Sequence, residues 1–195
     1  MSSNARAWLW WAGGAAALAY IATRPTVSST VGSAVQSGAE DVQAAIAGWK
    51  TVNQGPAWVP VLNAAESQFG IPPDLLARQA YQESRFRQDI IDGSRASSAG
   101  ALGIMQLEPQ YFSSVNVPRP YSDADTAAQI QQAAQEMGRL YGVFTDWGLA
   151  LAAYNDGQGN ISQYLAGTRA LPEETANYVA DILADVPLTG ATIPA

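Results

Sequence analysis

Apolar residues recur at intervals of three and four along most of this chain of 195 residues. The pattern runs from residue 57 to residue 186, for example in the series Leu62, Ala65 and Phe69. Such spacing places apolar side chains on one face of an α-helix. The alternation of apolar and polar residues that is typical of a β-strand is not evident in the sequence. The sequence therefore predicts a mainly α fold with one domain, residues 57–186, and no internal repeats.

Several helix starts are indicated by capping signals. Residues 72–74 place two prolines and an acid in a first turn and predict a helix over Pro73–Phe86. The segment Ser122–Asp125 is typical of an N-cap, and Pro172–Glu174 opens a further helix. The longest interruption, Arg87–Ala99, is rich in Ser, Asp and Gly and is compatible with a small hairpin.

The first 24 residues, 1–24, differ from the rest of the chain. Ala7–Thr23 is uncharged, lies between Arg6 and Arg24, and has aromatic residues near both ends, as interfacial anchors do. A helix there would be about 25 Å long, slightly short of a hydrocarbon core of about 30 Å. The alternatives are a retained transmembrane anchor, a cleaved signal peptide with a site at Ala17–Ala19, and a buried helix. The first two alternatives deliver the domain across a membrane.

Residues 25–56 form a predicted linker rich in Ser, Gly and Ala. Its apolar residues are spaced as in a weak amphipathic helix, for example Val31, Val35 and Val42. This helix is either a spacer or a stripe for a membrane surface or for self-association. Residues 187–195 are small and turn-rich, and we expect a flexible tail.

The charge and composition exclude several functions. The formal net charge is -7 and the basic residues are scattered, which argues against a nucleic-acid partner. The chain has no Cys and no His, so cysteine nucleophiles, serine-histidine triads and histidine-bound zinc are excluded. We expect no metal and no cofactor. Proton transfer near neutral pH is left to a carboxyl group, a tyrosine or Lys50, the only lysine, and a carboxyl group is the strongest candidate.

Glu83 is the carboxyl group that the spacing favours. In a helix over Pro73–Phe86, Leu76, Ala80 and Glu83 share one face. A carboxyl group held against apolar neighbours has its charged form disfavoured, so it stays protonated and can donate to a leaving oxygen. The alternative is a surface glutamate at a helix end, and periodicity alone does not decide between them.

Four segments occur in a fixed order. They are ESRF at Glu83–Phe86, GALGIMQ at Gly100–Gln106, AAYN at Ala152–Asn155, and LPEET followed by YV at Leu171–Val179. Together they resemble the soluble lytic transglycosylase family, whose lysozyme-like catalytic domain carries these motifs in this order. The resemblance covers about Val59–Leu183 and implies a mainly α, lysozyme-like single catalytic domain.

The resemblance also implies roles for individual residues. Glu83 would be the single catalytic acid and base, while Ser98 and Gln106 would line the groove that holds the sugar. Tyr154 would complete the site. Asn155 would cap the helix end, with contact to substrate as the alternative.

Other residues are expected to support the site. Met105 belongs to the glycine-rich motif, and Glu174 with Tyr178 would buttress the cleft. As an alternative, Glu174 is simply favourable in the first turn of a helix. Asp156 also lies near the motif, but turn chemistry explains it.

Two features depart from the family pattern. Glu66 starts a second Glu-Ser pair, but no glycine-glutamine string follows at the right distance, so we do not expect it to be catalytic. The interval from Glu83 to Gln106 is longer than the family's, so Ser94 or Ser97 is an alternative to Ser98.

The implied activity is cleavage of the β-1,4 bond between N-acetylmuramic acid and N-acetylglucosamine in peptidoglycan, with formation of 1,6-anhydro ends and local opening of the cell wall. One alternative is a lysozyme-type hydrolase on the same scaffold. Another is a non-catalytic wall-binding component of a phage particle or a secretion apparatus. The expected partners are peptidoglycan strands, the membrane through the N-terminal segment, and an envelope-spanning or virion assembly.

Overall fold

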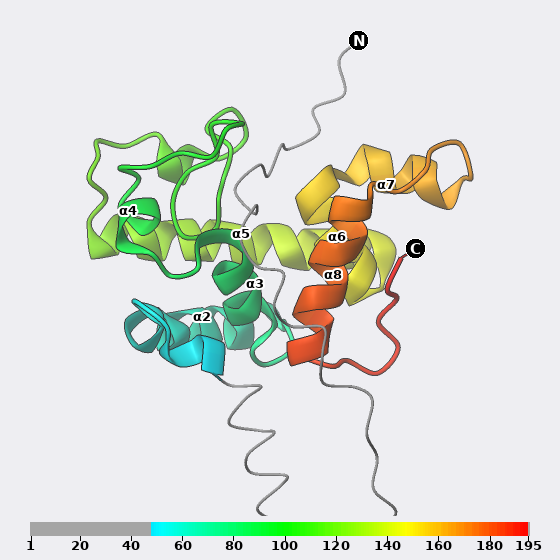
Figure 1. Cartoon of the computed structure of the whole chain (residues 1–195), viewed down its shortest axis with the longest axis horizontal. Helices are drawn as coiled ribbons and strands as arrows, with labels where there is room; N and C mark the ends of the chain where they lie inside the picture. Colours follow the sequence, from blue (N-terminus) through cyan, green and yellow to red (C-terminus); the bar gives the residue numbers. More distant parts are fainter. Residues whose placement is uncertain (1–47, 195) are drawn as a thin grey trace, which may run out of the picture.

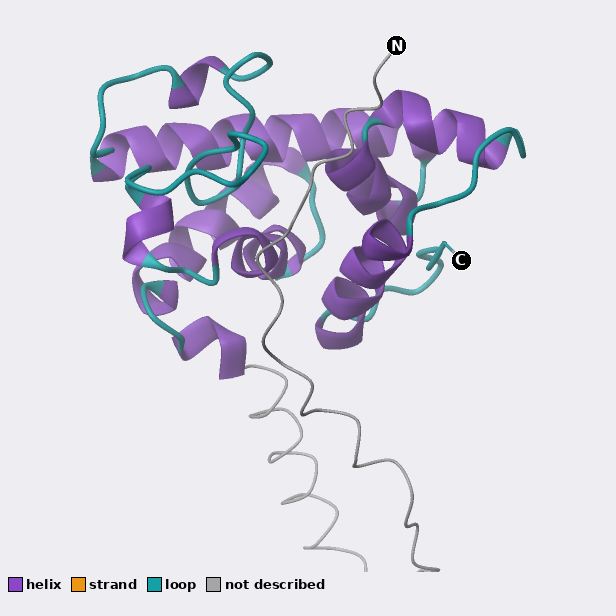
Figure 2. Cartoon of the chain, turned by 45° about the horizontal axis from the view of Figure 1, so that its top comes forward, coloured by secondary structure: helices purple, strands orange, loops and turns teal. Residues whose placement is uncertain are grey.

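The computed structural model describes residues 48–194, and Figure 1 shows their arrangement. Within this part seven α-helices and two 3-10 helices are present and no strand (Figure 2). The elements are η1 (Gly48–Thr51), α2 (Gly55–Phe69), α3 (Leu75–Ser84), α4 (Gln88–Ile91), η2 (Ser113–Val115), α5 (Asp123–Phe144), α6 (Trp147–Asp156), α7 (Gln158–Leu165) and α8 (Glu173–Asp185). The prediction of a mainly α fold is confirmed for this part of the chain.

Helix α5 is the long helix on which α2 and α6 pack (Figure 1). It begins with a capping box, at the position where the sequence predicted an N-cap. The hydroxyl of Ser122 accepts from the N–H of Asp125 at 3.2 Å, and the Asp125 carboxylate accepts from the N–H of Ser122 at 2.9 Å. Ile130 and Met137 on its inner face are fully buried. Helix α5 therefore supports α2 and α6 at the same time.

Helix α8 packs against α6 and also against α3. It begins at Glu173, directly after Pro172, as the sequence predicted. In Figure 1 α8 crosses in front of α6 and lies beside the end of α3. The C-terminal helix therefore faces the helix that carries the candidate acid.

A long irregular segment, residues 92–122, connects α4 to α5 and contains only η2 as a helical turn (Figure 2). In it Leu102 and Leu107 exchange two backbone hydrogen bonds of 3.0 and 2.9 Å, an isolated antiparallel bridge. The hairpin considered for Arg87–Ala99 is absent from the described chain, where α4 occupies part of that range. The Asp92 side chain accepts from the N–H of Ser94 at 2.8 Å, which favours a turn over strand pairing.

The packed part of the chain extends beyond the predicted range 57–186 at both ends. Trp49, predicted to lie in the linker, is buried with its ring centroid 6.1 Å from that of Tyr81. In the predicted tail, the N–H and hydroxyl of Thr192 donate to the Asp146 carboxylate at 3.0 and 2.5 Å. The predicted tail is therefore attached to the domain at Thr192, because the Asp146 carboxylate satisfies the polar groups of that residue.

We expect Gly148→Ala to displace this C-terminal segment. A methyl group at position 148 would lie 1.7 Å from the carbonyl oxygen of Thr192, so the segment must move. Faster amide exchange in residues 187–194 and a loss of about 1 to 2 kcal/mol in unfolding free energy are expected. Gly142→Ala is the control, since no heavy atom lies within 4 Å of its added methyl group. Equal exchange in the two variants would contradict the prediction.

No helix among residues 48–194 is both long enough and apolar enough to cross a membrane. The predicted anchor or signal segment, 1–24, and most of the linker, 25–56, lie outside the described residues. Their assignments stay predictions from sequence.

Candidate active site

Glu83 lies in the last turn of α3, on the face of the helix that points into the domain. It is 6% exposed, and Ala80 and Leu76 on the same face are fully buried. The structure therefore places Glu83 with the apolar residues that its spacing predicted. The alternative of a surface glutamate is wrong.

The helix that carries Glu83 is shorter than the predicted range Pro73–Phe86. It spans Leu75–Ser84 because the residues on either side, Asp74 and Arg85, adopt left-handed backbone conformations with φ of 68° and 51°. Phe86 also has a positive φ, of 51°, and its ring is fully buried. The chain thus turns sharply directly after Ser84, and the side chains of Arg85 and Phe86 do not predict a positive φ.

Glu66 caps the start of this helix. Its two carboxylate oxygens accept from the N–H groups of Asp74 and Ala77 at 2.8 and 2.9 Å. The first N–H groups of a helix have no partner within the helix, so a buried carboxylate there satisfies them. Glu66 therefore positions the helix of the candidate acid from its other end, which agrees with the expectation that it is not catalytic.

Glu66 should also make the stability of the protein depend on pH. Burial raises the pKa of Glu66 from 4.5 to about 7, and the backbone N–H groups oppose this only in part. The folded state therefore holds a proton that the unfolded state loses, and its stabilising effect, complete below pH 4.5, disappears as the pH rises through 7. We expect unfolding free energy to fall by about 2 kcal/mol between pH 5 and 7.5.

The measurement is chemical denaturation across that pH range. Histidine, the usual group titrating there, is absent from the chain, so the background is small. Glu66→Gln cannot lose the proton and should show a much flatter profile. A Glu66→Gln profile as steep as that of the wild type would assign the effect to another group.

Tyr178 of α8 contacts Glu83 directly. Its buried hydroxyl donates to Glu83 Oε1 at 2.7 Å. Burial raises the pKa of Tyr178 well above its ordinary value, the negative charge of Glu83 raises it further, and a hydrogen bond with Gln79 opposes them. Tyr178 therefore keeps its proton and donates a hydrogen bond to Glu83. Glu174, its predicted partner, is exposed one turn earlier on α8.

Gln79 was missed by the sequence analysis. It is fully buried on α3, one turn before Glu83. The spacing of four residues was the available signal, because it places both side chains on one helix face.

The glycine-rich motif forms a tight loop that Gln106 closes. Gln106 has a φ of 47°, and both its backbone N–H and its side-chain Nε2 donate to the carbonyl of Gly103, at 3.1 and 2.9 Å. Tyr154 of α6 donates from its hydroxyl to the carbonyl of Met105 at 2.9 Å. The motifs at Gly100–Gln106 and Ala152–Asn155 are thus joined by one buried hydrogen bond.

A side chain at Gly103 would be strained in this loop. Its φ is +74°, and an added methyl group would lie 1.9 Å from Oε1 of Gln129. Gln129, on α5, is fully buried and was not identified from the sequence. The sequence around Gln129 does not predict that its side chain lies beside the glycine-rich loop.

The serine candidates differ in their surroundings. Ser98 is exposed in the turn that begins at Ser97, whose carbonyl accepts from the N–H of Gly100 at 3.0 Å. The hydroxyl of Ser97 accepts from the N–H of Ala101 at 2.9 Å and so belongs to the loop itself. Ser94 is exposed in an earlier turn. The role of Ser98 toward substrate stays a prediction.

Asn155 lies inside α6 and does not cap it. The helix continues to Asp156, and Gly157 is the C-cap. Asn155 is 3% exposed, and its Oδ1 accepts from the hydroxyl of Thr175 on α8 at 2.8 Å. The predicted capping role is therefore wrong, because this contact turns the side chain inward.

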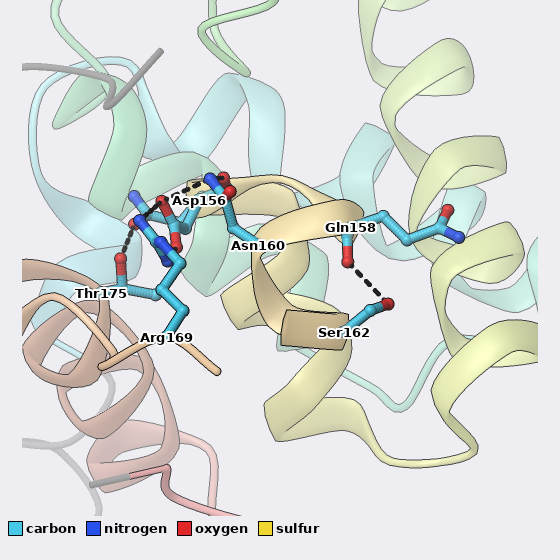
Figure 3. A network of polar contacts seen from close by, with 7 residues as sticks. Asp156, Gln158, Asn160, Ser162, Arg169 and Thr175 are labelled. Atoms are coloured by element: carbon cyan, nitrogen blue, oxygen red, sulfur yellow. Dashed lines mark hydrogen bonds and ion pairs between the residues drawn. The ribbon is translucent and has the colours of Figure 1, made fainter. Parts of the chain in front are cut away.

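Asp156 is held in an ion pair. Figure 3 shows its carboxylate with the guanidinium of Arg169, and Asn160 donating to it at 3.2 Å. These contacts give the buried carboxylate of Asp156 a structural role, because a charge-assisted ion pair fixes its position. Turn chemistry was the predicted explanation for Asp156, and Arg169 was not foreseen.

A cavity of about 420 Å³ opens beside this cluster. It is lined by Gln82, Asn155, Glu173, Glu174, Asn177, Tyr178 and Asp181. Tyr178 therefore contacts both the cavity and Glu83. The second cavity described, of about 520 Å³, lies between α2, α4 and the start of α5, with Trp58 and Tyr121 in its wall.

Comparison with known proteins identifies the domain. Residues 60–177 match the family described as "Transglycosylase SLT domain", which is more than half of the chain. A solved structure of similar fold is that of an inactive mutant, glutamate to glutamine, of the lytic transglycosylase Slt from Pseudomonas aeruginosa. The sequences are 26% identical with a TM-score of 0.50, and the match covers 65% of this chain but only 22% of that protein.

The matched range contains Glu83, the glycine-rich loop and Asn155, and it ends one residue before Tyr178. The buried acid and the two motifs around it are thus part of a recognised domain and not a chance arrangement. The chain belongs to the transglycosylase SLT domain family.

Proposed function

We propose that this chain is a peptidoglycan lytic transglycosylase with Glu83 as its single catalytic acid and base. The observation that carries the proposal is the buried carboxyl group of Glu83, held by Tyr178 at 2.7 Å inside a domain of this family. The absence of His and Cys from the chain supports a carboxyl group as the proton carrier. The related Slt mutant, which is inactive, carries glutamine in place of a glutamate.

In the proposed reaction, Glu83 first gives its proton to the β-1,4 glycosidic oxygen, and N-acetylglucosamine leaves with a free 4-hydroxyl. The acetamide oxygen of N-acetylmuramic acid bonds to C1 as the C1–O bond breaks, so the substrate supplies the nucleophile. Glu83, now a carboxylate, takes the proton of the C6 hydroxyl. The C6 oxygen then bonds to C1, the acetamide leaves it, and a 1,6-anhydro ring forms without water.

The other site residues are assigned to substrate positioning. We assign Ser98, Gln106, Tyr154 and Asn155 to the groove that holds the sugars. The closed loop at Gln106 and the bond from Tyr154 to it support a rigid wall, which favours catalysis because misplacement of a reacting group is costly.

The test is the mass of the products from purified peptidoglycan. A lytic transglycosylase leaves anhydro ends that are lighter by one water than the products of hydrolysis. Anhydro-muropeptides as the main products support the proposal. Reducing ends would make the chain a lysozyme-type hydrolase, and intact glycan would leave it a wall-binding protein.

We expect Tyr178→Phe to lower kcat about tenfold with a smaller change in KM. The hydroxyl positions Glu83 by donating a hydrogen bond to it, and one such bond is worth up to about 1.5 kcal/mol. Steady-state kinetics on soluble glycan measure this. Tyr121→Phe is the matched control, since it removes a buried hydroxyl that donates to the backbone carbonyl of Val115, away from Glu83. Equal loss of kcat in both would indicate a general packing effect.

The location of the enzyme is proposed from sequence alone. Residues 1–24 would anchor the domain in a membrane, facing the cell wall, where it would open the wall locally for an envelope-spanning or virion assembly. The mass of the mature protein tests the anchor: a chain that begins at Tyr20 shows a cleaved signal instead.

A further inference from the structure

Gln79 is a buried amide beside the pair that Glu83 and Tyr178 form. It lies on α3 four residues before Glu83, so both side chains point to the same face of the helix. Its side chain is fully buried, and α3 packs against α8, the helix that carries Tyr178. Gln79 therefore lies next to the candidate acid, although the proposed reaction gives it no role.

A glutamine is an unfavourable residue for this position if packing is its only task. Neither Nε2 nor Oε1 of Gln79 makes a hydrogen bond of full geometry within residues 48–194. A buried polar group without such a bond lowers stability, whereas Leu76 and Ala80 fill the same helix face without that cost. A buried amide of this kind calls for an explanation, and a role in catalysis is one.

Tyr178 is the neighbour on which Gln79 acts. Burial raises the pKa of Tyr178, and a hydrogen bond with Gln79 opposes that rise, as expected of an N–H that donates to the hydroxyl oxygen. This contact falls short of full geometry, as contacts of catalytic groups often do before substrate binds and tightens them. The hydroxyl of Tyr178 in turn donates to Glu83 Oε1 at 2.7 Å. The three side chains thus form one series of donors that ends at the acid.

The direction of this series matters because Glu83 loses and regains a proton in the proposed reaction. The Tyr178 hydroxyl has one proton, so it can either donate to Glu83 or turn away and accept from it. An N–H of Gln79 at the hydroxyl oxygen disfavours the second arrangement, because it occupies an acceptor position and repels a hydroxyl proton that turns toward it. The acidic proton of Glu83 is then kept on Oε2, the oxygen that Tyr178 does not hold.

We propose that Gln79 is a positioning residue for the catalytic acid and acts through the Tyr178 hydroxyl. It donates to that hydroxyl, and so fixes the direction of the Tyr178 proton and the oxygen of Glu83 that carries the acidic proton. This inference rests on the proposed function and adds to it a residue that acts on the acid only through its tyrosine partner.

The first experiment is a double-mutant cycle on the full chain. Gln79→Met keeps the length of the side chain and removes its amide. In the wild-type background it should lower kcat about fivefold, with a smaller change in KM. In a Tyr178→Phe background it should lower kcat less than about twofold, because the hydroxyl through which it acts is gone. Equal factors in the two backgrounds, or a loss confined to KM, would overturn the inference.

Tyr121→Phe is the matched background for this cycle. It removes a buried hydroxyl that donates to the carbonyl of Val115 at 2.8 Å. Gln79→Met should lower kcat by the same factor here as in the wild type, because distant sites act independently. If Tyr121→Phe suppresses the effect as much as Tyr178→Phe does, the coupling is not specific and the assignment is wrong. Melting temperatures of all variants report whether the fold is retained.

A second measurement leaves Gln79 unaltered and decides the question if Gln79→Met does not fold. It records the side-chain amide resonances of Gln79 in the isotope-labelled full chain by nuclear magnetic resonance. These resonances should shift in Tyr178→Phe and stay in place in Tyr121→Phe. Resonances that ignore the loss of the Tyr178 hydroxyl would show that Gln79 does not donate to it.

The outcomes separate this inference from the proposed function. Anhydro products from the wild-type chain, together with an unchanged kcat in Gln79→Met, would leave the proposed function in place and remove the role of Gln79. If the wild-type chain cleaves no glycan while the Gln79 resonances still respond to Tyr178→Phe, the proposed function fails and the contact with Tyr178 stands.

Discussion

Glu83→Gln should reduce turnover of peptidoglycan by a factor of about 10² to 10⁴ while leaving the fold intact. Glutamine has nearly the same shape but cannot deliver or take up the proton. Its amide still accepts from the Tyr178 hydroxyl, so the contact between α3 and α8 is kept. The measurement is the rate of release of soluble fragments, together with circular dichroism and the melting temperature.

The chain contains a matched control for this experiment. Glu66 is the other glutamate of a Glu-Ser pair, is also buried, and caps the same helix. Glu66→Gln should keep activity within about tenfold of the wild type, because it shifts the helix slightly but leaves the acid in place. A Glu83→Gln protein that keeps most of its turnover would show that another group carries the proton. If Glu83→Gln and Glu66→Gln lose the same amount of activity, a shift of helix α3 and not the loss of the acid would explain the result.

Gly103→Ala is expected to cost about 2 to 4 kcal/mol of stability and to lower activity by at least an order of magnitude. The backbone at +74° disfavours any side chain by about 1 kcal/mol, and the methyl group would overlap the buried Gln129 amide at 1.9 Å. Relief of that overlap must move either the buried Gln129 amide or the loop that Gln106 closes. Denaturation midpoints and kinetics on soluble glycan measure the two effects.

Gly100→Ala separates strain from overlap. Gly100 has a φ of +83° in the same loop, but no heavy atom lies within 4 Å of an added methyl group. This variant should lose only about 1 kcal/mol. In Gly103→Ala, the further change Gln129→Ala should restore part of the loss. If Gly100→Ala is as damaging as Gly103→Ala, backbone strain and not the Gln129 contact is the cause.

The position of the acid was accessible from sequence because helical spacing is a local property. Leu76, Ala80 and Glu83 recur at four and three, and the structure buries all three. The capping box at Ser122–Asp125 follows the same logic, since it involves residues three apart. Errors at the ends of α3 arose where backbone conformations of positive φ, which the side chains do not encode, interrupt the helix.

The partners of the acid were harder to predict. Tyr178 was expected only to support the cleft, and its direct bond to Glu83 joins residues 95 positions apart. Arg169 and Gln129 were not identified at all. The ion pair of Arg169 with Asp156 and the contact of Gln129 with Gly103 join residues that are distant in the sequence, and no local spacing predicts such contacts. Asn155 was assigned to a helix cap, but Thr175 on another helix turns it inward.

The sequence by itself determined the mainly α class, the family motifs and the choice of Glu83, because these depend on residue types and on spacings of a few residues. Only the tertiary structure decided which side chains hold that acid, which cavity lies beside it and how far the domain extends. Those features depend on helices that meet after the chain has folded back on itself, and burial of a polar group is acceptable only where such a partner arrives.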